Sequence, residues 1–272
     1  MCLIASAPEY AFGFYDPIPQ IAALAQKYGI GCHSDCCLGS YINPFTEEAG
    51  FKIPCEFDFK VPGVTSISCD PHKFCYGPKG LSVILYRTKE LRRGTFFTIS
   101  EWTGGMYVTP SMAGSRSGAV ITGTWAALMK QGKQGFIDKA KTLLTAAHNI
   151  REAIKKSNGI QLISDHDNTV VSFKSDVGNC VAINDRMQKV HRWSLNTIQG
   201  PLSSHLVVTD ANAQHWKEFV PCLEECLEFL KKNPEENDKG DAALYGLSEK
   251  IPNKGVVGEF IIYYLESILD AL

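Results

Sequence analysis

The sequence predicts an α/β protein whose first part contains a parallel β-sheet and whose last part is a smaller α+β domain. Up to about residue 157, short apolar segments rich in β-branched residues alternate with helical segments, and two long helical patterns close this part. From Ile160, short strand-like segments alternate with single helical patterns. We therefore expect two domains, residues 1–157 and residues 158–272.

The first elements form a strand, helix, strand unit. Cys2–Ser6 is a short apolar run that predicts a strand. Asp16 can cap a following helix, and Pro17 suits its first turn. The apolar spacing and the end of this helix are given by Ile21, Leu24, Ala25, Tyr28 and Gly29. Ile30–Ser34 predicts a second strand that ends at Asp35, and such a unit favours parallel pairing.

The remaining elements follow from the same patterns. Further strands are predicted at Val64–Ser68, Leu81–Tyr86, Gln161–Ile163, Thr169–Phe173 and Ser204–Thr209. Helices are predicted at Ala119–Gln131, Phe136–Lys156, Cys180–Trp193 and Ala213–Lys232, followed by a polar loop at Asn233–Gly240. The apolar face of the second of these helices consists of Leu143, Leu144, Ala147, Ile150 and Ile154.

Composition excludes several classes of protein. Lys plus Arg (27) against Asp plus Glu (29) gives a net charge of −2 with no basic stripe, so we do not expect a nucleic-acid-binding protein. No segment approaches the roughly 18 consecutive apolar residues of a membrane helix. Residues 1–10 also lack the basic start and long apolar run of a secretory signal. We therefore expect no membrane segment and a cytoplasmic location.

The chain has ten cysteines, which is many for 272 residues. No C-x-x-C pair occurs, so a zinc site is not indicated. Cys222 and Cys226 share one face of a predicted helix, but no histidine or second pair stands near them in the sequence. We expect no metal site, and we interpret most of the cysteines as small buried hydrophobic residues in a reducing compartment.

Two short segments carry residues suited to catalysis. Lys73 stands just beyond a predicted strand, where Pro71 and His72 restrict it, and such a lysine can form a Schiff base if burial or nearby cations lower its pKa. Asp35 ends a strand of a parallel sheet, where ligands bind in open α/β folds. Pyridoxal phosphate requires both a lysine for its aldehyde and an acid opposite its pyridine nitrogen. The alternatives are an ordinary surface lysine and an aspartate that caps a helix or turn.

Longer motifs carry a resemblance to a known family. The string SISCDPHKFCYGPKG resembles the Schiff-base segment of the sphingosine-1-phosphate lyase family, which belongs to the group II pyridoxal-phosphate-dependent decarboxylases. HSDCCLGSYI is similar to its aspartate segment. The segments APEYAFGFYDPIPQIAALAQKYGI, EWTGGMYVTPSMAGSR and WAALMKQGKQGF also resemble this family, and the resemblance fades after about residue 157. It implies fold type I, the aspartate-aminotransferase-like fold, with pyridoxal 5'-phosphate as cofactor.

The resemblance also implies roles for individual residues. Lys73 would be the Schiff-base lysine, His72 would contact the cofactor phosphate, and Asp35 would pair with the pyridine nitrogen. Cys37 would pack against the cofactor ring. Lys79 matches a second active-site lysine of the family and would bind substrate.

Arg116 is a further candidate for substrate binding. It follows Ser115 in a loop that, in dimers of this family, approaches the site of the neighbouring subunit. The alternative is that Arg116 only holds its loop together. The resemblance thus implies a homodimer, and in full-length eukaryotic relatives it also implies the cytosolic face of the endoplasmic reticulum.

The sequence departs from the family pattern at three points. Cys36 replaces an alanine, and Pro71 replaces a threonine. The third departure is that the match begins close to the strand before Asp35, so the family's N-terminal half is not represented. In relatives that half supplies a membrane anchor, early strands, a glycine-rich phosphate cradle and a residue that stacks on the ring. We therefore expect the 272 residues alone to bind the cofactor more weakly.

The implied reaction is cleavage of a carbon–carbon bond in a phosphorylated long-chain base. Its products are a fatty aldehyde and phosphoethanolamine, and the reaction belongs to sphingolipid catabolism. Lys79, a tyrosine or the substrate's own phosphate could act as the general base. The alternatives are an amino-acid decarboxylase on the same fold and a non-catalytic remnant that keeps the centre of the fold.

Overall fold

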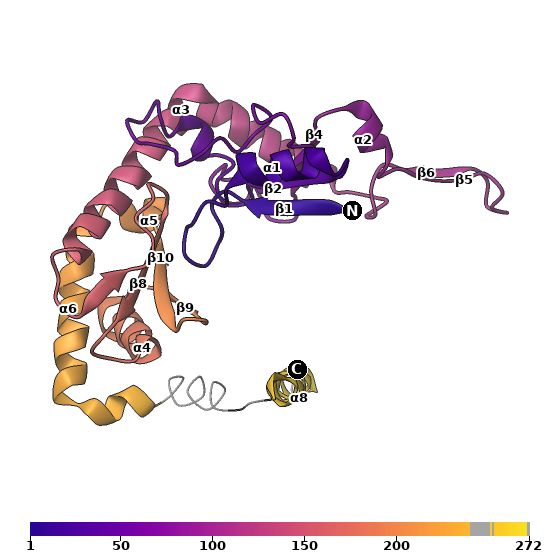
Figure 1. Cartoon of the computed structure of the whole chain (residues 1–272). Helices are drawn as coiled ribbons and strands as arrows, with labels where there is room; N and C mark the ends of the chain where they lie inside the picture. The colour runs from indigo at the N-terminus through magenta and orange to yellow at the C-terminus, as the bar shows by residue number, and fades with distance from the viewer. Residues whose placement is uncertain (240–250, 252, 271–272) are drawn as a thin grey trace. The chain divides into compact units, whose positions relative to one another are not determined.

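The computed structural model describes residues 1–239, 251 and 253–270 (Figure 1). Contacts divide these residues into two compact units. The first consists of Met1–Asn149, Ser164–Val171 and Val208–Gln214, and the second of Ile150–Ile163, Ser172–Val207 and the residues from His215 onward. Each unit is described below by itself. The domain boundary near residue 157 stays a prediction.

The sheet of the first unit has four strands, ordered as in the sequence. They are β1 (Cys2–Ser6), β2 (Gly31–Asp35), β3 (Ser66–Cys69) and β4 (Val83–Tyr86). The predicted parallel pairing is confirmed for β1, β2 and β3. β4 runs antiparallel to β3, because the segment that joins them contains only turns and no crossover helix.

Helix α1 (Ile18–Lys27) packs against this sheet through small side chains. Its buried residues are Ile18, Ala22 and Ala25. The predicted apolar face is therefore partly wrong, since Leu24 and Tyr28 are 47% and 66% exposed. The core that α1 shares with the strands and the following loops consists of Ala5, Ala7, Ile18, Ala22, Ala25, Cys32, Cys36, Phe57, Val61, Val64 and Ile67. Alanine and cysteine at these positions allow the helix to lie close to the strands.

The predicted cap of α1 is also wrong. The Asp16 carboxylate accepts a hydrogen bond from the Ser6 backbone N–H at 2.7 Å and makes none to the start of the helix. Asp16 thereby ties the end of β1 to the residues that lead into α1. The predicted end is confirmed, because Gly29 adopts the left-handed φ of +63° that favours glycine.

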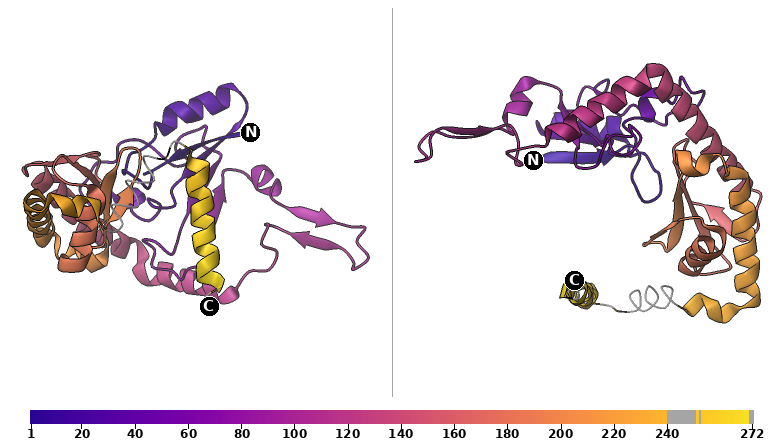
Figure 2. Two further views of the ribbon diagram at one scale, coloured as in Figure 1. Left: turned by 90° about the horizontal axis from the view of Figure 1, so that it is seen from below. Right: turned by 180° about the vertical axis from the view of Figure 1, so that it is seen from behind.

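The rest of the first unit contains elements that the sequence patterns did not indicate. They are the 3₁₀ turn η1 (Asn43–Phe45), helix α2 (Lys89–Arg93) and a hairpin of β5 (Phe97–Ile99) and β6 (Tyr107–Thr109). The hairpin extends away from the four-stranded sheet (Figure 2). Its exposed side chains include Phe97, Trp102, Met106 and Val108.

Helix α3 (Gly118–Ile154) is interrupted at Gly132, whose φ of +58° and ψ of 178° are not helical. Two consecutive helices were predicted here, and the break confirms them. The predicted apolar face is also confirmed, since Leu143, Leu144, Ala147, Ile150 and Ile154 are all buried.

The second sheet has the order β7 (Ile160–Leu162), β8 (Val170–Ser175), β10 (Ser203–Val207) and β9 (Asn196–Ile198). The helices that follow these strands along the chain are α4 (Cys180–His191), α5 (Asp210–Ala213), α6 (Trp216–Lys232), the 3₁₀ turn η2 (Pro234–Asp238) and α8 (Lys254–Asp270). The single helix expected from Ala213 is thus replaced by α5 and α6. The predicted polar loop contains η2, and its last residue, Gly240, lies outside the described residues.

Within the described ranges, no helix combines the length and the apolar character needed to cross a bilayer.

We expect Gly39→Ala to destabilise the first unit. A Cβ atom at this position would overlap the Ala7 carbonyl oxygen and the Asn43 side-chain amide. Those two groups are hydrogen-bonded to each other at 2.8 Å and are buried, so they cannot move apart without loss. The free energy of unfolding, measured by denaturant titration, should fall by about 1–3 kcal/mol.

Gly118→Ala is the matched control for this substitution. No atom lies within 4 Å of its added Cβ, and the residue begins a helix. Its stability should match or slightly exceed that of the unaltered chain. Equal stability of the two variants would contradict the close approach at Gly39.

Candidate active site

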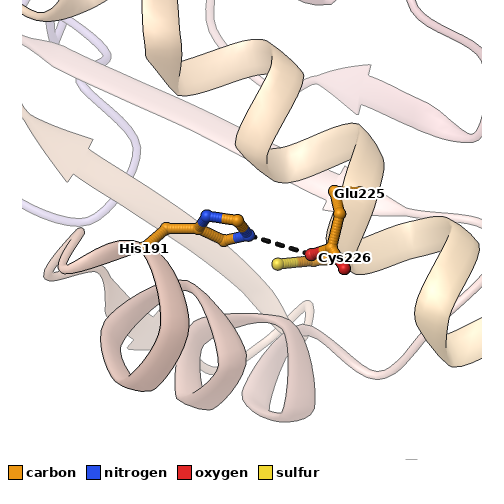
Figure 3. A group of neighbouring side chains, drawn as sticks. All are labelled: His191, Glu225 and Cys226. Carbon is orange, nitrogen blue, oxygen red and sulfur yellow. Dashed lines mark hydrogen bonds and ion pairs between the residues drawn. The ribbon is translucent and has the colours of Figure 1, made fainter.

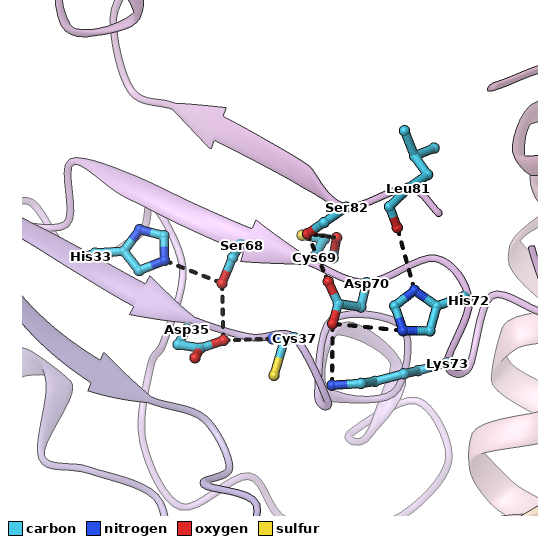
Figure 4. Close-up of polar contacts among 10 residues, drawn as sticks. All are labelled: His33, Asp35, Cys37, Ser68, Cys69, Asp70, His72, Lys73, Leu81 and Ser82. Carbon is cyan, nitrogen blue, oxygen red and sulfur yellow. Dashed lines mark hydrogen bonds and ion pairs between the residues drawn. The ribbon is translucent and has the colours of Figure 1, made fainter. Parts of the chain in front are cut away.

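The candidate site lies where β2 and β3 end. The two strands are parallel neighbours, and Asp35 stands opposite Ser68 in their register. Parallel strands finish at the same edge of a sheet, so the last residues of β2 and the segment after β3 meet there. That segment carries Asp70 and Lys73, and Figure 4 shows how these side chains lie.

The Asp35 carboxylate is held by hydrogen bonds from both strands. Its Oδ1 atom accepts one from the Cys37 backbone N–H at 3.0 Å and one from the Ser68 hydroxyl at 2.9 Å. Burial by itself would raise the pKa of Asp35, but these hydrogen bonds outweigh it and lower the pKa below its usual range. Asp35 therefore stays an anion at neutral pH.

His33 extends this network along the face of the sheet. Its Nε2 lies 3.1 Å from the Ser68 hydroxyl oxygen and its Nδ1 lies 2.8 Å from that of Ser66. Because the Ser68 hydroxyl donates to Asp35, it accepts from His33, which assigns the imidazole proton to Nε2. Burial lowers the pKa of His33 despite the nearby Asp35 carboxylate, so the ring is neutral at pH 7.

Lys73 is half-buried, and its ammonium group lies near two side chains. Nζ lies 3.2 Å from Asp70 Oδ2, and the Cys37 side chain is close enough to act on the lysine electrostatically. Burial alone would lower the pKa of Lys73, but Cys37 and Asp70 together raise it above its usual value. The condition that the sequence analysis attached to Schiff-base formation, a pKa lowered by burial or nearby cations, is not met here, because the Asp70 anion faces the lysine.

His72 and Asp70 belong to the same turn. The His72 Nδ1–H donates to the Leu81 carbonyl at 3.3 Å, and Nε2 lies 4.0 Å from Asp70 Oδ2. Asp70 in turn accepts from the Ser82 hydroxyl at 2.7 Å. The turn is thus attached to the segment that leads into β4, which limits the movement of Lys73.

Cys37 lies between Asp35 and Lys73, and its backbone N–H donates to the Asp35 carboxylate (Figure 4). The two substitutions relative to the family pattern, Cys36 and Pro71, are both buried side chains. The Cys36 thiol lies 3.3 Å from the Ser34 hydroxyl. Burial raises the pKa of Cys36 to about 12, so it is a neutral thiol.

Lys79 and Arg116 do not belong to this contact network. Both side chains are exposed, and no hydrogen bond or ion pair among the described residues links either of them to Lys73 or Asp35. The structure therefore brings together four of the six predicted site residues, Asp35, Cys37, His72 and Lys73. The catalytic and binding roles of all six stay predictions.

Two residues that contact the predicted site residues, Ser68 and Asp70, were not singled out from the sequence. For Ser68 a signal exists, because serines at alternate positions of a strand point to one face and here frame His33. For Asp70 the spacing of three residues to Lys73 fits a turn but does not distinguish an ion pair from a solvated carboxylate.

The second unit contains a separate cluster of potential ligand atoms. His191, Glu225 and Cys226 offer one atom each, all within 4.8 Å of one another (Figure 3). Glu225 is already engaged, since it accepts from His191 at 2.9 Å and from both Nε and Nη2 of Arg186 at 3.1 and 2.5 Å. The hydrogen bonds from the Arg186 guanidinium, with that from His191, lower the pKa of Glu225 to about 2. We therefore assign the cluster to ion pairing.

The cysteines match the sequence-based interpretation only in part, since it expected most of them to be buried. All ten are unpaired, and five of them are buried, Cys32, Cys36, Cys75, Cys180 and Cys226.

The parallel sheet, the lysine beyond β3 and the carboxylate at the end of β2 are features that pyridoxal-phosphate-dependent enzymes of fold type I share. The sequence profile of the pyridoxal-dependent decarboxylase conserved domain matches residues 2–176. The chain belongs to the pyridoxal-dependent decarboxylase family.

Individual relatives are similar over nearly the whole chain. The sphingosine-1-phosphate lyase of Arabidopsis thaliana is 38% identical over 97% of this chain and 48% of its own length, and that of Saccharomyces cerevisiae is 36% identical over 98% and 46%. The structure of a sphingosine-1-phosphate lyase of Burkholderia pseudomallei matches with a TM-score of 0.81 and 33% identity, over 93% of this chain and 56% of that one. The chain thus spans about half the length of these relatives.

A more distant structure shows the fold alone. The glutamate decarboxylase of Lactobacillus brevis matches with a TM-score of 0.69 at 18% identity, covering 84% of this chain.

Pyridoxal 5'-phosphate is the cofactor of this family, and the residues present fit it. A half-buried amine and an anionic carboxylate stand at adjacent strand ends, as the cofactor's aldehyde and protonated ring nitrogen require. Lys73 would hold the aldehyde, and Asp35 would hold the ring nitrogen.

We expect Ser68→Ala to raise the pKa of Asp35. A hydrogen bond to the ionised carboxylate lowers its pKa, so loss of the Ser68 donor shifts the titration to higher pH. The measurement is NMR titration of the Asp35 side-chain carbon. Ser66→Ala is the control, since Ser66 contacts His33 and makes no hydrogen bond to Asp35. An unchanged Asp35 titration in Ser68→Ala would contradict this network.

We expect Asp70→Asn to lower the pKa of Lys73. Removal of the anion 3.2 Å from Nζ destabilises the ammonium form, so the lysine loses its proton at lower pH. The rate of reductive methylation of Lys73, followed by peptide mass spectrometry from neutral to alkaline pH, should reach its midpoint at lower pH. Asp58→Asn is the control, because its carboxylate contacts the Lys60 backbone N–H. A midpoint that moves equally in both variants, or in neither, would rule out the ion pair.

Proposed function

We propose that the chain carries the active-site half of a pyridoxal-phosphate-dependent carbon–carbon lyase. Its substrate would be a phosphorylated long-chain base, and its products a fatty aldehyde and phosphoethanolamine. The observation that carries the proposal is the placement of Asp35, held by Cys37 and Ser68, at the end of β2 and of Lys73, paired with Asp70, in the turn after the neighbouring strand β3. The names of the similar proteins supply the substrate class.

When bound, the cofactor supplies an aldehyde that condenses with amines and a ring that accepts electrons from the bond being cleaved. Lys73 would hold the cofactor through its side-chain amine. Asp35 would keep the ring nitrogen protonated, which its lowered pKa supports. Because the pKa of Lys73 is raised, its ammonium must lose a proton before the amine can attack.

His72 and Cys37 would complete the cofactor contacts. The His72 Nε2 atom, whose partner Nδ1–H is engaged with the Leu81 carbonyl, would contact the phosphate. Cys37 would pack against the ring. Lys79 and Arg116 would bind the substrate phosphate, which their exposed cationic groups support.

The proposal extends to the assembly. A homodimer is supported by the large apolar side chains that the β5–β6 hairpin exposes, among them Trp102, Met106 and Val108 at 54%, 89% and 68%. Residues 1–157 would form the cofactor-binding part and residues 158–272 the small domain. The cytosolic location stays a prediction.

We expect pyridoxal phosphate followed by borohydride to label Lys73. The reduced adduct is stable, and mass spectrometry of the peptides locates it. Lys73→Ala should abolish the label, whereas Lys133→Ala should keep it, since Lys133 is an exposed lysine paired with Glu48 at 2.9 Å. Scattered labelling of surface lysines, unaffected by Lys73→Ala, would overturn the assignment.

Substrate class is tested on the same preparation. The chain, supplied with cofactor, should release phosphoethanolamine from a phosphorylated long-chain base, and Lys73→Ala should not. Release of carbon dioxide from an amino acid instead would identify a decarboxylase. Neither product, together with an unlabelled Lys73, would identify a non-catalytic protein.

A further inference from the structure

The turn that carries Lys73 ends in a strained residue. Tyr76 adopts a left-handed φ of +61°, which side chains with a Cβ atom rarely occupy. The turn itself is closed by backbone hydrogen bonds from Lys73 N–H to the Asp70 carbonyl at 3.1 Å and from Gly77 N–H to the Pro71 carbonyl at 2.9 Å. These hydrogen bonds within the turn do not account for the left-handed φ of Tyr76, so another contact must stabilise it.

That contact comes from residues far away in the sequence. The Tyr76 hydroxyl donates a hydrogen bond to Oδ2 of Asp210, 134 residues further along the chain. The Lys139 ammonium donates to the other oxygen, Oδ1, at 2.5 Å. Lys139 Nζ also lies 5.5 Å from the centroid of the Tyr76 ring. The three side chains therefore contact one another in a closed set, which we call the Tyr76 clamp.

Both partners of Tyr76 sit on regular elements. Lys139 belongs to α3, and Asp210 is the first residue of α5. The start of α5 is itself fixed, because the Thr209 N–H donates to Asn212 Oδ1 at 2.8 Å. Burial raises the pKa of Tyr76, and the Asp210 carboxylate raises it further, so the hydroxyl keeps its proton and remains a donor.

Helix α3 also lies close to the turn. A Cβ atom at Gly77 would lie 3.0 Å from Thr124 Oγ1 and 3.3 Å from the Pro71 carbonyl oxygen, so the backbone there has little room. The Tyr76 N–H donates to the Lys73 carbonyl at 3.3 Å, which couples the conformation of Tyr76 to that of the lysine three residues earlier.

We propose that Tyr76, through its contacts with Asp210 and Lys139, is a positioning residue that fixes the Lys73 turn in the geometry needed to capture the cofactor aldehyde. This inference rests on the proposed function, since it assigns a purpose to the position of Lys73. If the clamp opens, Tyr76 leaves the left-handed region, the turn loosens and Lys73 becomes more mobile and more exposed.

Two reaction rates at Lys73, which should change in opposite directions, test the clamp. In Tyr76→Phe and in Asp210→Asn, the rate of cofactor capture by Lys73 at saturating pyridoxal phosphate should fall about tenfold, because a misplaced amine reacts slowly. The concentration of pyridoxal phosphate that gives half of the maximal rate should change by less than this factor. The visible absorbance of the lysine adduct should appear more slowly. Reductive methylation of Lys73 by formaldehyde and cyanoborohydride should instead become about threefold faster as the turn opens.

Glu225→Gln is the matched control. Glu225 is, like Asp210, a carboxylate that accepts from two side chains, but its partners are Arg186 and His191 in the second unit. This variant should leave both rates at Lys73 unchanged. Methylation that accelerates at every lysine would show general unfolding, and rates at Lys73 within twofold of the unaltered chain in Tyr76→Phe would overturn the clamp.

The two proposals can fail separately. If the unaltered chain forms no adduct at Lys73, the proposed function is wrong for these residues, and the methylation rates alone decide whether the clamp restrains the turn. If the adduct forms normally in Tyr76→Phe and Asp210→Asn, the proposed function stands and the positioning role is wrong.

Discussion

The register of β2 against β3 is the constraint on which the site depends. In this register Ser34 stands opposite Ile67 and Asp35 opposite Ser68. Because side chains alternate along a strand, burying Ile67 in the core presents Ser66 and Ser68 on the other face, where they contact His33 and Asp35. A slip by one residue would expose Ile67 and remove the donors from Asp35. The packing that stabilises the sheet is therefore also what aligns the Asp35 carboxylate.

The fold was predictable where local patterns and packing agree. Strands β1 and β2 and the break in α3 follow from apolar runs and from glycine. The buried face of α1 was misjudged because close packing favoured the alanines over Leu24 and Tyr28. The antiparallel direction of β4 depends on the connection that precedes it, and the β5–β6 hairpin has short strands whose side chains are mostly exposed. Neither leaves a periodic signal in the sequence.

The site was predictable in its two main residues and much less in their surroundings. Strand-end position indicated Asp35, and flanking residues indicated Lys73, although each had an ordinary alternative until the family motifs were considered. The direction of the pKa shift of Lys73 required the position of Asp70, which local spacing does not give. The Tyr76 clamp joins residues from three separated parts of the chain, so it becomes visible only once the chain is folded.

The cysteines have a practical consequence for work in solution. Thiolates, not thiols, react with electrophiles, and burial raises the pKa of nine of the cysteines. Cys2 is the exposed cysteine among the ten, and it lies at the start of β1. A thiol-directed fluorophore or surface tether is therefore expected to join Cys2 ahead of the five buried cysteines, with Cys37, Cys55, Cys69 and Cys222 partly accessible.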